Sequence, residues 1–185
     1  IIGLTVGIAS SLIILLYIFH ETSFDKQHSK GDRIYRLSTE IKEPDNSFKW
    51  ANMTRPAAFT IKNENPEVEQ AARLSGISGQ GGTRFDYNQV DYYQENVYAA
   101  DSTIFEIFDF EFVSVNPKTA LEAPNSIVIN QSMAQKIFKN EDPIGQTLKS
   151  GGNREMILQV TGVYKDMPNT SHLIADALIS WKTIF

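Results

Sequence analysis

The first nineteen residues, Ile1–Phe19, form a run without a charged side chain, and no other feature constrains the fold as strongly. Twelve of the nineteen are Ile, Leu, Val or Phe. As an α-helix the run would be roughly 28 Å long, close to the thickness of the hydrocarbon core of a bilayer. Each of these apolar side chains favours insertion by roughly 0.3–0.6 kcal/mol, and the sum outweighs the cost of the few hydroxyls. We therefore predict a transmembrane helix over residues 1–20.

Two other interpretations compete with a membrane helix. A cleaved signal peptide would have a basic start and a shorter apolar core, and the sequence shows neither. A buried helix of a soluble protein is the second alternative, although such helices rarely stay uncharged over this length. The sequence begins inside the run without Met, so we expect it to be part of a longer protein. Mixed charges follow the run instead of a basic cluster, which favours a position of residues 21–185 outside the cytoplasm.

Small residues recur every four positions in the run, at Gly3, Gly7 and Ser11. Such a stripe lies on one helix face and lets a second helix approach closely. Glycine is also common in membrane helices, so composition alone explains the pattern equally well. Our hypothesis is that this helix packs in a bundle.

All charged residues lie after position 20, so the net charge of −5 belongs to residues 21–185. This length is sufficient for a hydrophobic core, and eleven Phe residues argue against disorder. The chain has no basic stripe, which makes nucleic acid an unsuitable partner. It has no cysteine, which excludes disulfides and thiolate chemistry.

Short strands and helices interleave after the run without a regular βα repeat, which predicts an α+β fold. The apolar helix should extend to about residue 28 and end at Gly31-Asp32. The expected strands are 33–42, 83–87, 90–95, 126–130, 156–165 and 175–180, and 68–77 fits a strand and a helix equally. Helices are expected at 54–63 with Thr54 as N-cap, after Asp101, and after Asn130. A turn is expected at Pro143-Ile144-Gly145 and a hairpin at 151–153.

The sequence shows no enzymatic motif. A P-loop and a G-x-S-x-G elbow are both absent, and the glycine-rich loop 76–82 is not followed by a helix. The three histidines are scattered without the spacing of metal ligands. We predict a non-catalytic chain with no cofactor and no metal site.

Several sequence words occur in an order that resembles a known family. They are FDKQH (24–28), DRIYRL (32–37), ADSTIFEIFDF (100–110), PNSIVIN (124–130), EDPIGQTL (141–148), VTGVYKD (160–166) and NTSH (169–172). Together they resemble the MacB-like periplasmic core domain of FtsX-like ABC transporter permeases, especially the Bacteroidetes type. The residues of these words that we interpret as scaffold are Asp101, Phe105, Phe108, Ile127, Asn130, Asp142, Pro143, Gly145, Gly162 and Asp166. The phenylalanines suit a core, and Gly162 suits close packing in a strand.

The resemblance implies a mixed α/β periplasmic domain between the first two spans of a permease in the bacterial inner membrane. Its build would be a porter-like β-α-β subdomain with a smaller second subdomain, which we place at about 97–149. The implied partners are a P-loop ATPase subunit, a second permease chain in a homodimer or heterodimer, and in some systems a periplasmic adaptor protein. The implied role is to relay ATP-driven motion of the spans to export or extraction of a substrate. The alternatives are the sensor domain of a single-span signalling receptor and a membrane-tethered hydrolase.

Overall fold

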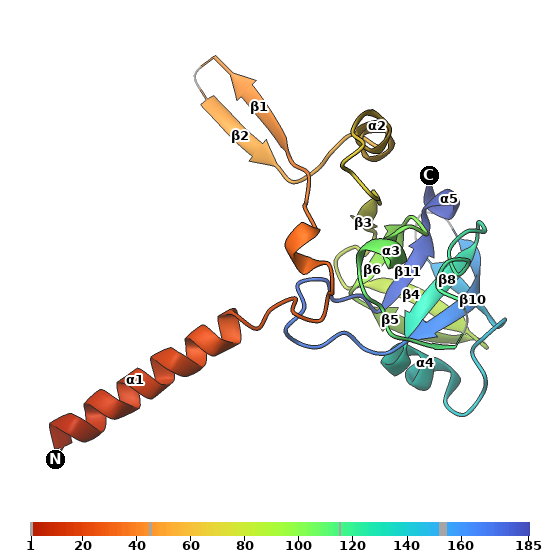
Figure 1. The fold of residues 1–185 in the computed structure, drawn as a ribbon. Coiled ribbons are helices and arrows are strands. Elements are labelled where there is room, and N and C mark those ends of the chain that lie inside the picture. Colours follow the sequence, from red (N-terminus) through yellow and green to blue (C-terminus); the bar gives the residue numbers. More distant parts are fainter. Residues whose placement is uncertain (1, 45, 115, 152–154) are drawn as a thin grey trace.

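A long helix, a compact body and a projecting arm make up the computed structural model, which describes residues 2–44, 46–114, 116–151 and 155–185. The helix is α1 (Ile2–Glu21). The arm consists of a hairpin, β1 (Thr39–Glu43) with β2 (Asn46–Trp50), and of α2 (Ala57–Glu64). Figure 1 shows α1 and the arm leaving the body in different directions, with the body built around one sheet.

Helix α1 has the length and composition to cross a membrane. Over Gly3–Glu21 its mean hydropathy is 1.9, and none of this segment is buried against the rest of the chain. The predicted apolar helix is present over Ile2–Glu21, but its predicted extension to residue 28 is wrong. The chain leaves the helix after Glu21 and forms turns, followed by a short 3-10 helix at Gly31–Arg33.

The body contains a nine-stranded mixed sheet. The strand order is β3 (Leu74–Gly76), β6 (Val97–Ala100), β11 (Ala177–Ser180), β8 (Ser126–Asn130), β10 (Met156–Tyr164), β9 (Thr147–Gly151), β4 (Thr83–Tyr87) and β5 (Val90–Gln94), and β7 (Phe112–Ser114) pairs with β10. The pairs β10–β8 and β11–β6 are parallel, and the other pairs are antiparallel. The mixed α/β fold class is confirmed.

Strand β8 lies at the centre of the core because both of its faces are buried. Ile127 and Ile129 enter one apolar cluster, which α4 (Gln131–Phe138) covers with Met133 and Ile137. Val128 enters a second cluster on the other face, where α3 (Ile104–Ile107) packs. A strand buried on both faces is apolar at every position, which explains why the IVI triplet could be recognised as a strand.

The arm has no buried core of its own. None of residues 29–82 that the structure describes is buried. In the hairpin, Ile41 pairs with Phe48 and Thr39 pairs with Trp50, so these residues share one face. Of the strand predicted at 33–42, only residues 39–42 belong to β1. Trp50 is 57% exposed.

Several predicted elements are confirmed. The strands predicted at 83–87 and 126–130 form over these residues, those predicted at 90–95, 156–165 and 175–180 form with slightly shorter bounds as β5, β10 and β11, and the helix after Asn130 forms as α4. Helix α2 begins later than predicted, with Pro56 in place of Thr54 at its N-cap. No strand or helix was predicted at β2, β6, β7, β9 or α5 (Trp181–Ile184). The predicted hairpin at 151–153 falls largely outside the described residues. The sheet does not divide at 97–149, because β6, β8 and β9 pair with strands from outside that range.

Candidate functional site

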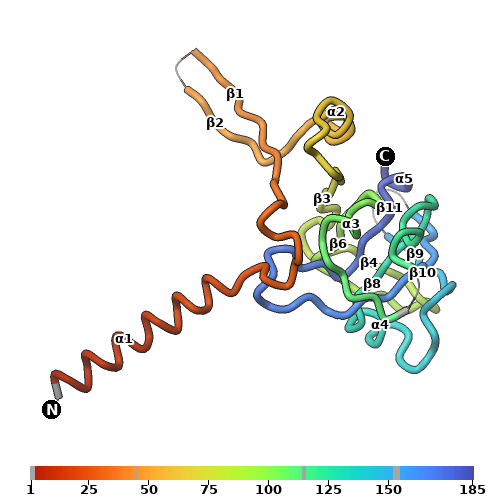
Figure 2. The backbone as a smooth tube through the Cα atoms, viewed as in Figure 1, coloured from red at the N-terminus to blue at the C-terminus, as the bar shows by residue number. Residues whose placement is uncertain are grey.

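The place where the membrane helix meets the body is the strongest candidate for a functional site. We call it the joint: residues 22–34 together with their contacts to residues 104–109 and 170–172. In Figures 1 and 2 the loop between β10 and β11 lies beside the segment that follows α1. The contacts below therefore connect segments that are up to 147 residues apart in the sequence.

Side-chain hydroxyls end the helix at the start of the joint. Thr22 Oγ1 donates to the carbonyl of Ile18 (2.8 Å), and Ser23 Oγ donates to that of His20 (2.6 Å). The backbone N–H groups of Thr22 and Ser23 donate to the same two carbonyls (2.9 and 3.1 Å), so each hydroxyl adds a second hydrogen bond at the helix end. Asp25 then adopts a left-handed conformation with φ 56°, and the chain turns toward the body. This is the physical reason why the helix does not extend to residue 28.

Asp25 makes the first attachment to the body. Its backbone N–H donates to the carbonyl of Thr170 (2.9 Å). Its carboxylate accepts a hydrogen bond from the backbone N–H of His172 (2.9 Å) and lies 2.6 Å from Nδ1 of the same residue. The ring of Phe24 packs on the His172 ring, with centroids 4.8 Å apart.

His28 and its neighbours make the second attachment. Nδ1 of His28 accepts a hydrogen bond from the backbone N–H of Asp109 (3.2 Å), and the Asp109 carboxylate accepts one from the backbone N–H of Ser29. Nζ of Lys30 donates to the carbonyl of Glu106 (2.9 Å). Each attachment thus contains a carboxylate held by a backbone N–H from the opposite segment.

The carboxylates of the two attachments, Asp25 and Asp109, are stabilised in the ionised form. Burial opposes ionisation of Asp25, but the hydrogen bonds from the backbone and ring of His172 outweigh it and lower the pKa of Asp25. The backbone N–H of Ser29 lowers the pKa of Asp109. At pH values above the usual carboxyl pKa, both groups are ionised and therefore stabilise the closed joint, in which both attachments are formed.

A rigid aromatic cluster supports the part of the body that the joint contacts. The rings of Phe110 and Tyr164 have centroids 5.0 Å apart, and Phe105 contacts both Phe110 and Phe112 edge-on. Tyr164 is fully buried, which raises the pKa of its phenol well above the usual value, and its hydroxyl donates to the carbonyl of Ala175 (2.8 Å). The prediction that these phenylalanines are core residues holds only in part, because Phe105, Phe108, Phe110 and Phe112 are partly buried and pack against the second cluster.

Two scaffold residues fix the start of α4. The side-chain oxygen of Asn130 accepts a hydrogen bond from the backbone N–H of Met133 (2.8 Å), so its predicted N-cap role is confirmed. Asp166, at the end of β10, accepts a hydrogen bond from Oγ of Ser132 (3.0 Å) in the first turn of the helix. These contacts hold α4 against the sheet.

The remaining scaffold residues shape turns and a close approach. Asp142 Oδ1 accepts from the backbone N–H of Ile144 (3.0 Å), and Gly145 follows Pro143 in the turn with φ 82°. Gly162 lies at a register shift of β10, where a Cβ would be 3.0 Å from the Phe112 ring. The predicted turn and the close packing at Gly162 are confirmed.

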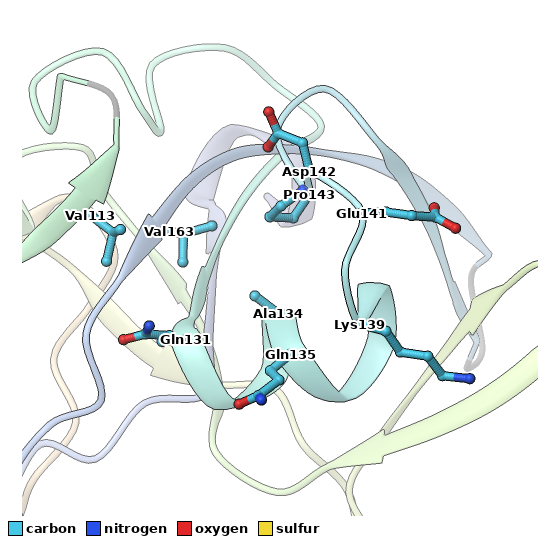
Figure 3. Close-up of a pocket in the computed structure, with 9 residues that line it drawn as sticks. All are labelled: Val113, Gln131, Ala134, Gln135, Lys139, Glu141, Asp142, Pro143 and Val163. Carbon is cyan, nitrogen blue, oxygen red and sulfur yellow. The ribbon is translucent and has the colours of Figure 1, made fainter.

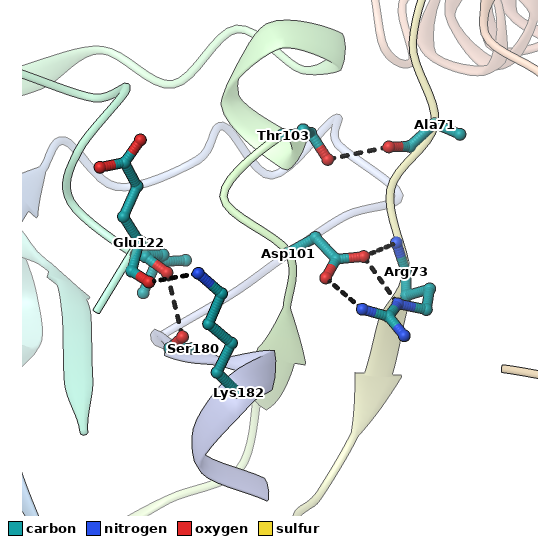
Figure 4. A network of polar contacts seen from close by, with 8 residues as sticks. Ala71, Arg73, Asp101, Thr103, Glu122, Ser180 and Lys182 are labelled. Atoms are coloured by element: carbon teal, nitrogen blue, oxygen red, sulfur yellow. Dashed lines mark hydrogen bonds and ion pairs between the residues drawn. The ribbon is translucent and has the colours of Figure 1, made fainter. Parts of the chain in front are cut away.

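Asp101 does not cap α3, contrary to the prediction. Thr103 is at the N-cap, and the Asp101 carboxylate instead binds Arg73 through Nε (2.8 Å), Nη2 (2.7 Å) and the backbone N–H (2.9 Å). Figure 4 shows this pair beside the bond from Thr103 to the carbonyl of Ala71. The Arg73 guanidinium also stacks on Phe59 of α2 and on Trp181 of α5, which ties the arm to the body.

A shallow cleft of about 430 Å³ lies beside α4 (Figure 3). Apolar and polar side chains both line it, namely Val113, Ala134, Pro143 and Val163 together with Gln131, Gln135, Lys139, Glu141 and Asp142. Among the described residues, no group of three or more His, Asp or Glu side chains is placed to hold a metal ion. The expected lack of a cofactor and of catalysis stays a prediction.

The small-residue stripe of α1 faces open space. Nothing lies within 4 Å of a Cβ built at Gly3 or Gly7, and Oγ of Ser11 donates to the carbonyl of Gly7 (2.9 Å). The helix therefore has room for a neighbour on this face, and its packing in a bundle stays a prediction.

Sequence reasoning missed the joint as a site. Asp25 and His172 are too far apart in the chain for any spacing rule to connect them. The available signal was that FDKQH and NTSH both belong to the words that carry the family resemblance.

Comparison with known proteins places the chain among periplasmic domains of permeases. The sequence profile of the MacB-like periplasmic core domain family matches residues 1–184. No curated protein sequence matches the chain.

Three solved structures share the fold. A domain of a protein assigned as a permease from Porphyromonas gingivalis has a TM-score of 0.62 at 22% identity, and the match covers 73% of this chain and 60% of that one. The periplasmic region of MacB from Actinobacillus actinomycetemcomitans has a TM-score of 0.54 at 17% identity over 72% and 57% of the two chains. The extracellular domain of the noncanonic ABC-type transporter YknZ from Gram-positive bacteria has a TM-score of 0.51 at 16% identity over 70% and 63%. The match thus spans less than two thirds of the length of each of these structures.

Proposed function

We propose, from the premise that this chain belongs to the family of MacB-like periplasmic core domains, that it relays ATP-driven movement of membrane spans to the periplasmic side of an ABC transporter permease. The body would transmit this movement to export or extraction of a substrate. The proposal gives the chain no enzymatic activity of its own.

The observation that carries the proposal is the attachment of the joint at two separate places. A flexible linker after α1 would let the helix move without the body. Here, Asp25 forms hydrogen bonds with Thr170 and His172. Hydrogen bonds also connect residues 28–30 with residues 106–109. A displacement of the end of α1 must therefore move the body or break these contacts.

The proposal also names the molecular context. The sequence lacks a P-loop, so ATP would be hydrolysed by a separate subunit or domain on the cytoplasmic side. We propose that the chain lies in the bacterial inner membrane with residues 21–185 in the periplasm. A second permease chain would form a homodimer or heterodimer with it, and a periplasmic adaptor protein would be a further partner.

The test separates ATP hydrolysis from movement of the body. The parent permease would be reconstituted with its ATPase in nanodiscs, with a spin label at exposed Gln89 in the turn between β4 and β5 of each copy. In the wild type we expect ATP to change the distance between the two labels. The double variant Asp25→Ala, Asp109→Ala should keep ATP hydrolysis and lose most of this change.

The matched control is Asp32→Ala, which removes an exposed carboxylate of the same segment. It should behave as the wild type. An unchanged ATP-dependent distance in the double variant would refute the relay through the joint. Failure to recover any ATPase with the intact permease would refute the transporter context.

A further inference from the structure

His28 differs from the other two histidines of the chain because it is buried. It is 6% exposed, whereas His20 and His172 are exposed. Its ring packs edge-on against Phe108, with centroids 5.1 Å apart. The side chain therefore lies inside the second attachment of the joint, between the segment after α1 and the body.

The hydrogen bonds of His28 define which form of the ring fits. A backbone N–H can only donate, so the bond from Asp109 N to Nδ1 requires Nδ1 to be unprotonated. A neutral ring then carries its proton on Nε2, which lies 3.3 Å from the side-chain amide of Gln27. If the Gln27 amide is oriented with its oxygen toward His28, this oxygen accepts a hydrogen bond from Nε2–H. The closed joint thus fits the neutral ring.

Protonation replaces this acceptor by a donor. Two N–H groups would then face each other at about 3 Å, and the Asp109 N–H would lose its partner in a partly buried place. The charged groups that interact with His28 are the carboxylates of Asp25 and Asp109. Each already accepts from a backbone N–H of the joint, at His172 and Ser29 respectively. These carboxylates attract a protonated ring, and a ring that turns toward either of them leaves the Asp109 N–H.

We propose that His28 makes the joint a proton-sensitive latch, closed while the ring is neutral and loosened when the ring is protonated. Acidification of the periplasm would then weaken the coupling between the membrane helix and the body. This consequence rests on the proposed relay function, whereas the latch itself is a property of the joint.

The test measures closure of the joint directly. The full chain in nanodiscs would carry spin labels at exposed Glu21 and Lys118, and their distance distribution would be compared at about pH 7.5 and about pH 5.5, on either side of the usual histidine pKa. We expect a narrow distribution at the higher pH and loss of most of the narrow component at the lower pH. His28→Asn keeps an acceptor near the position of Nδ1 and does not titrate, so its distribution should stay narrow at both pH values.

The control is His20→Asn, which removes an exposed histidine of α1 and should keep the pH response. If His28→Asn responded to pH as the wild type does, or if the wild type stayed narrow at the lower pH, the latch would be refuted. A broad distribution at both pH values would instead refute the closed joint on which the relay depends.

A second measurement covers the case that His28→Asn does not fold. In the wild type, hydrogen exchange protection of the Asp109 amide should fall at about pH 5.5, after correction for intrinsic rates, while the Val128 amide in β8 stays protected. Equal protection of the Asp109 amide at both pH values would also refute the latch.

Discussion

Removal of the Asn130 side chain should measurably destabilise the body. In Asn130→Ala the backbone N–H of Met133 loses its cap, which costs about 1 kcal/mol and at most about 2 kcal/mol. The amide of Asn130 also donates to Oδ1 of Asp176 over a long 3.3 Å, and Asp176 keeps its bond from the backbone N–H of Asn96. This second loss is therefore small. We expect a total of about 1.5 kcal/mol.

The assay is urea unfolding of the full chain in detergent, followed by the fluorescence of Trp181, which is 9% exposed. With a slope of about 2 kcal/mol per molar urea, the midpoint should fall by about 0.7 M. Asn130→Ser is the matched control, because a serine hydroxyl can accept the same bond from Met133 and should recover most of the loss. A shift below about 0.2 M for Asn130→Ala, or equal shifts for both variants, would contradict the capping argument.

Three further predictions concern the joint, a turn and the membrane helix. The folded pKa values of Asp25 and Asp109 are lowered, so their contribution to closure is present above the unfolded value of about 3.9 and is lost as pH falls through the folded values. In His28→Asn, whose joint should stay closed at about pH 5.5, protection of the Ser29 amide should therefore drop only below about pH 4. Gly145→Ala forces a Cβ onto a residue with φ 82° and should cost about 1 kcal/mol in urea unfolding, and a neutral result would refute the strain. Gly7→Leu should weaken assembly of the parent permease, as measured by the yield of intact complex in mild detergent, and an unchanged yield would contradict the small-residue interface.

Local patterns were sufficient to predict elements whose causes are local. The predicted strands at 83–87 and 90–95 rest on two short aromatic segments on either side of Asn88-Gln89, which adopt positive φ in the turn. The strand at 126–130 was found because a strand buried on both faces is apolar throughout. The Asn130 cap was found because its partner is three residues away.

Distant partners explain what the sequence could not predict. Asp101 precedes α3 at a position typical of a helix cap. Its carboxylate instead forms a bidentate ion pair with Arg73, 28 residues earlier in the chain, and does not cap the helix. The short strand β7 is held by its pairing with β10, about 50 residues later, and its own three residues carry no strand signal. Apolar and polar residues do alternate over residues 33–42, but only the last part of this segment pairs with another strand, β2.

The position of the joint relative to the sheet explains how a movement of α1 could reach the whole body. Had the helix extended to residue 28, its end would lie about 10 Å further along the axis and the body would follow on a single backbone. The turn at Asp25 instead brings the chain against two segments of the body. Residues 104–109 lead into β7, which pairs with β10, and residues 170–172 lead into β11. Strands β10 and β11 are the two neighbours of the central strand β8, so a displacement at the joint acts on both sides of the sheet centre.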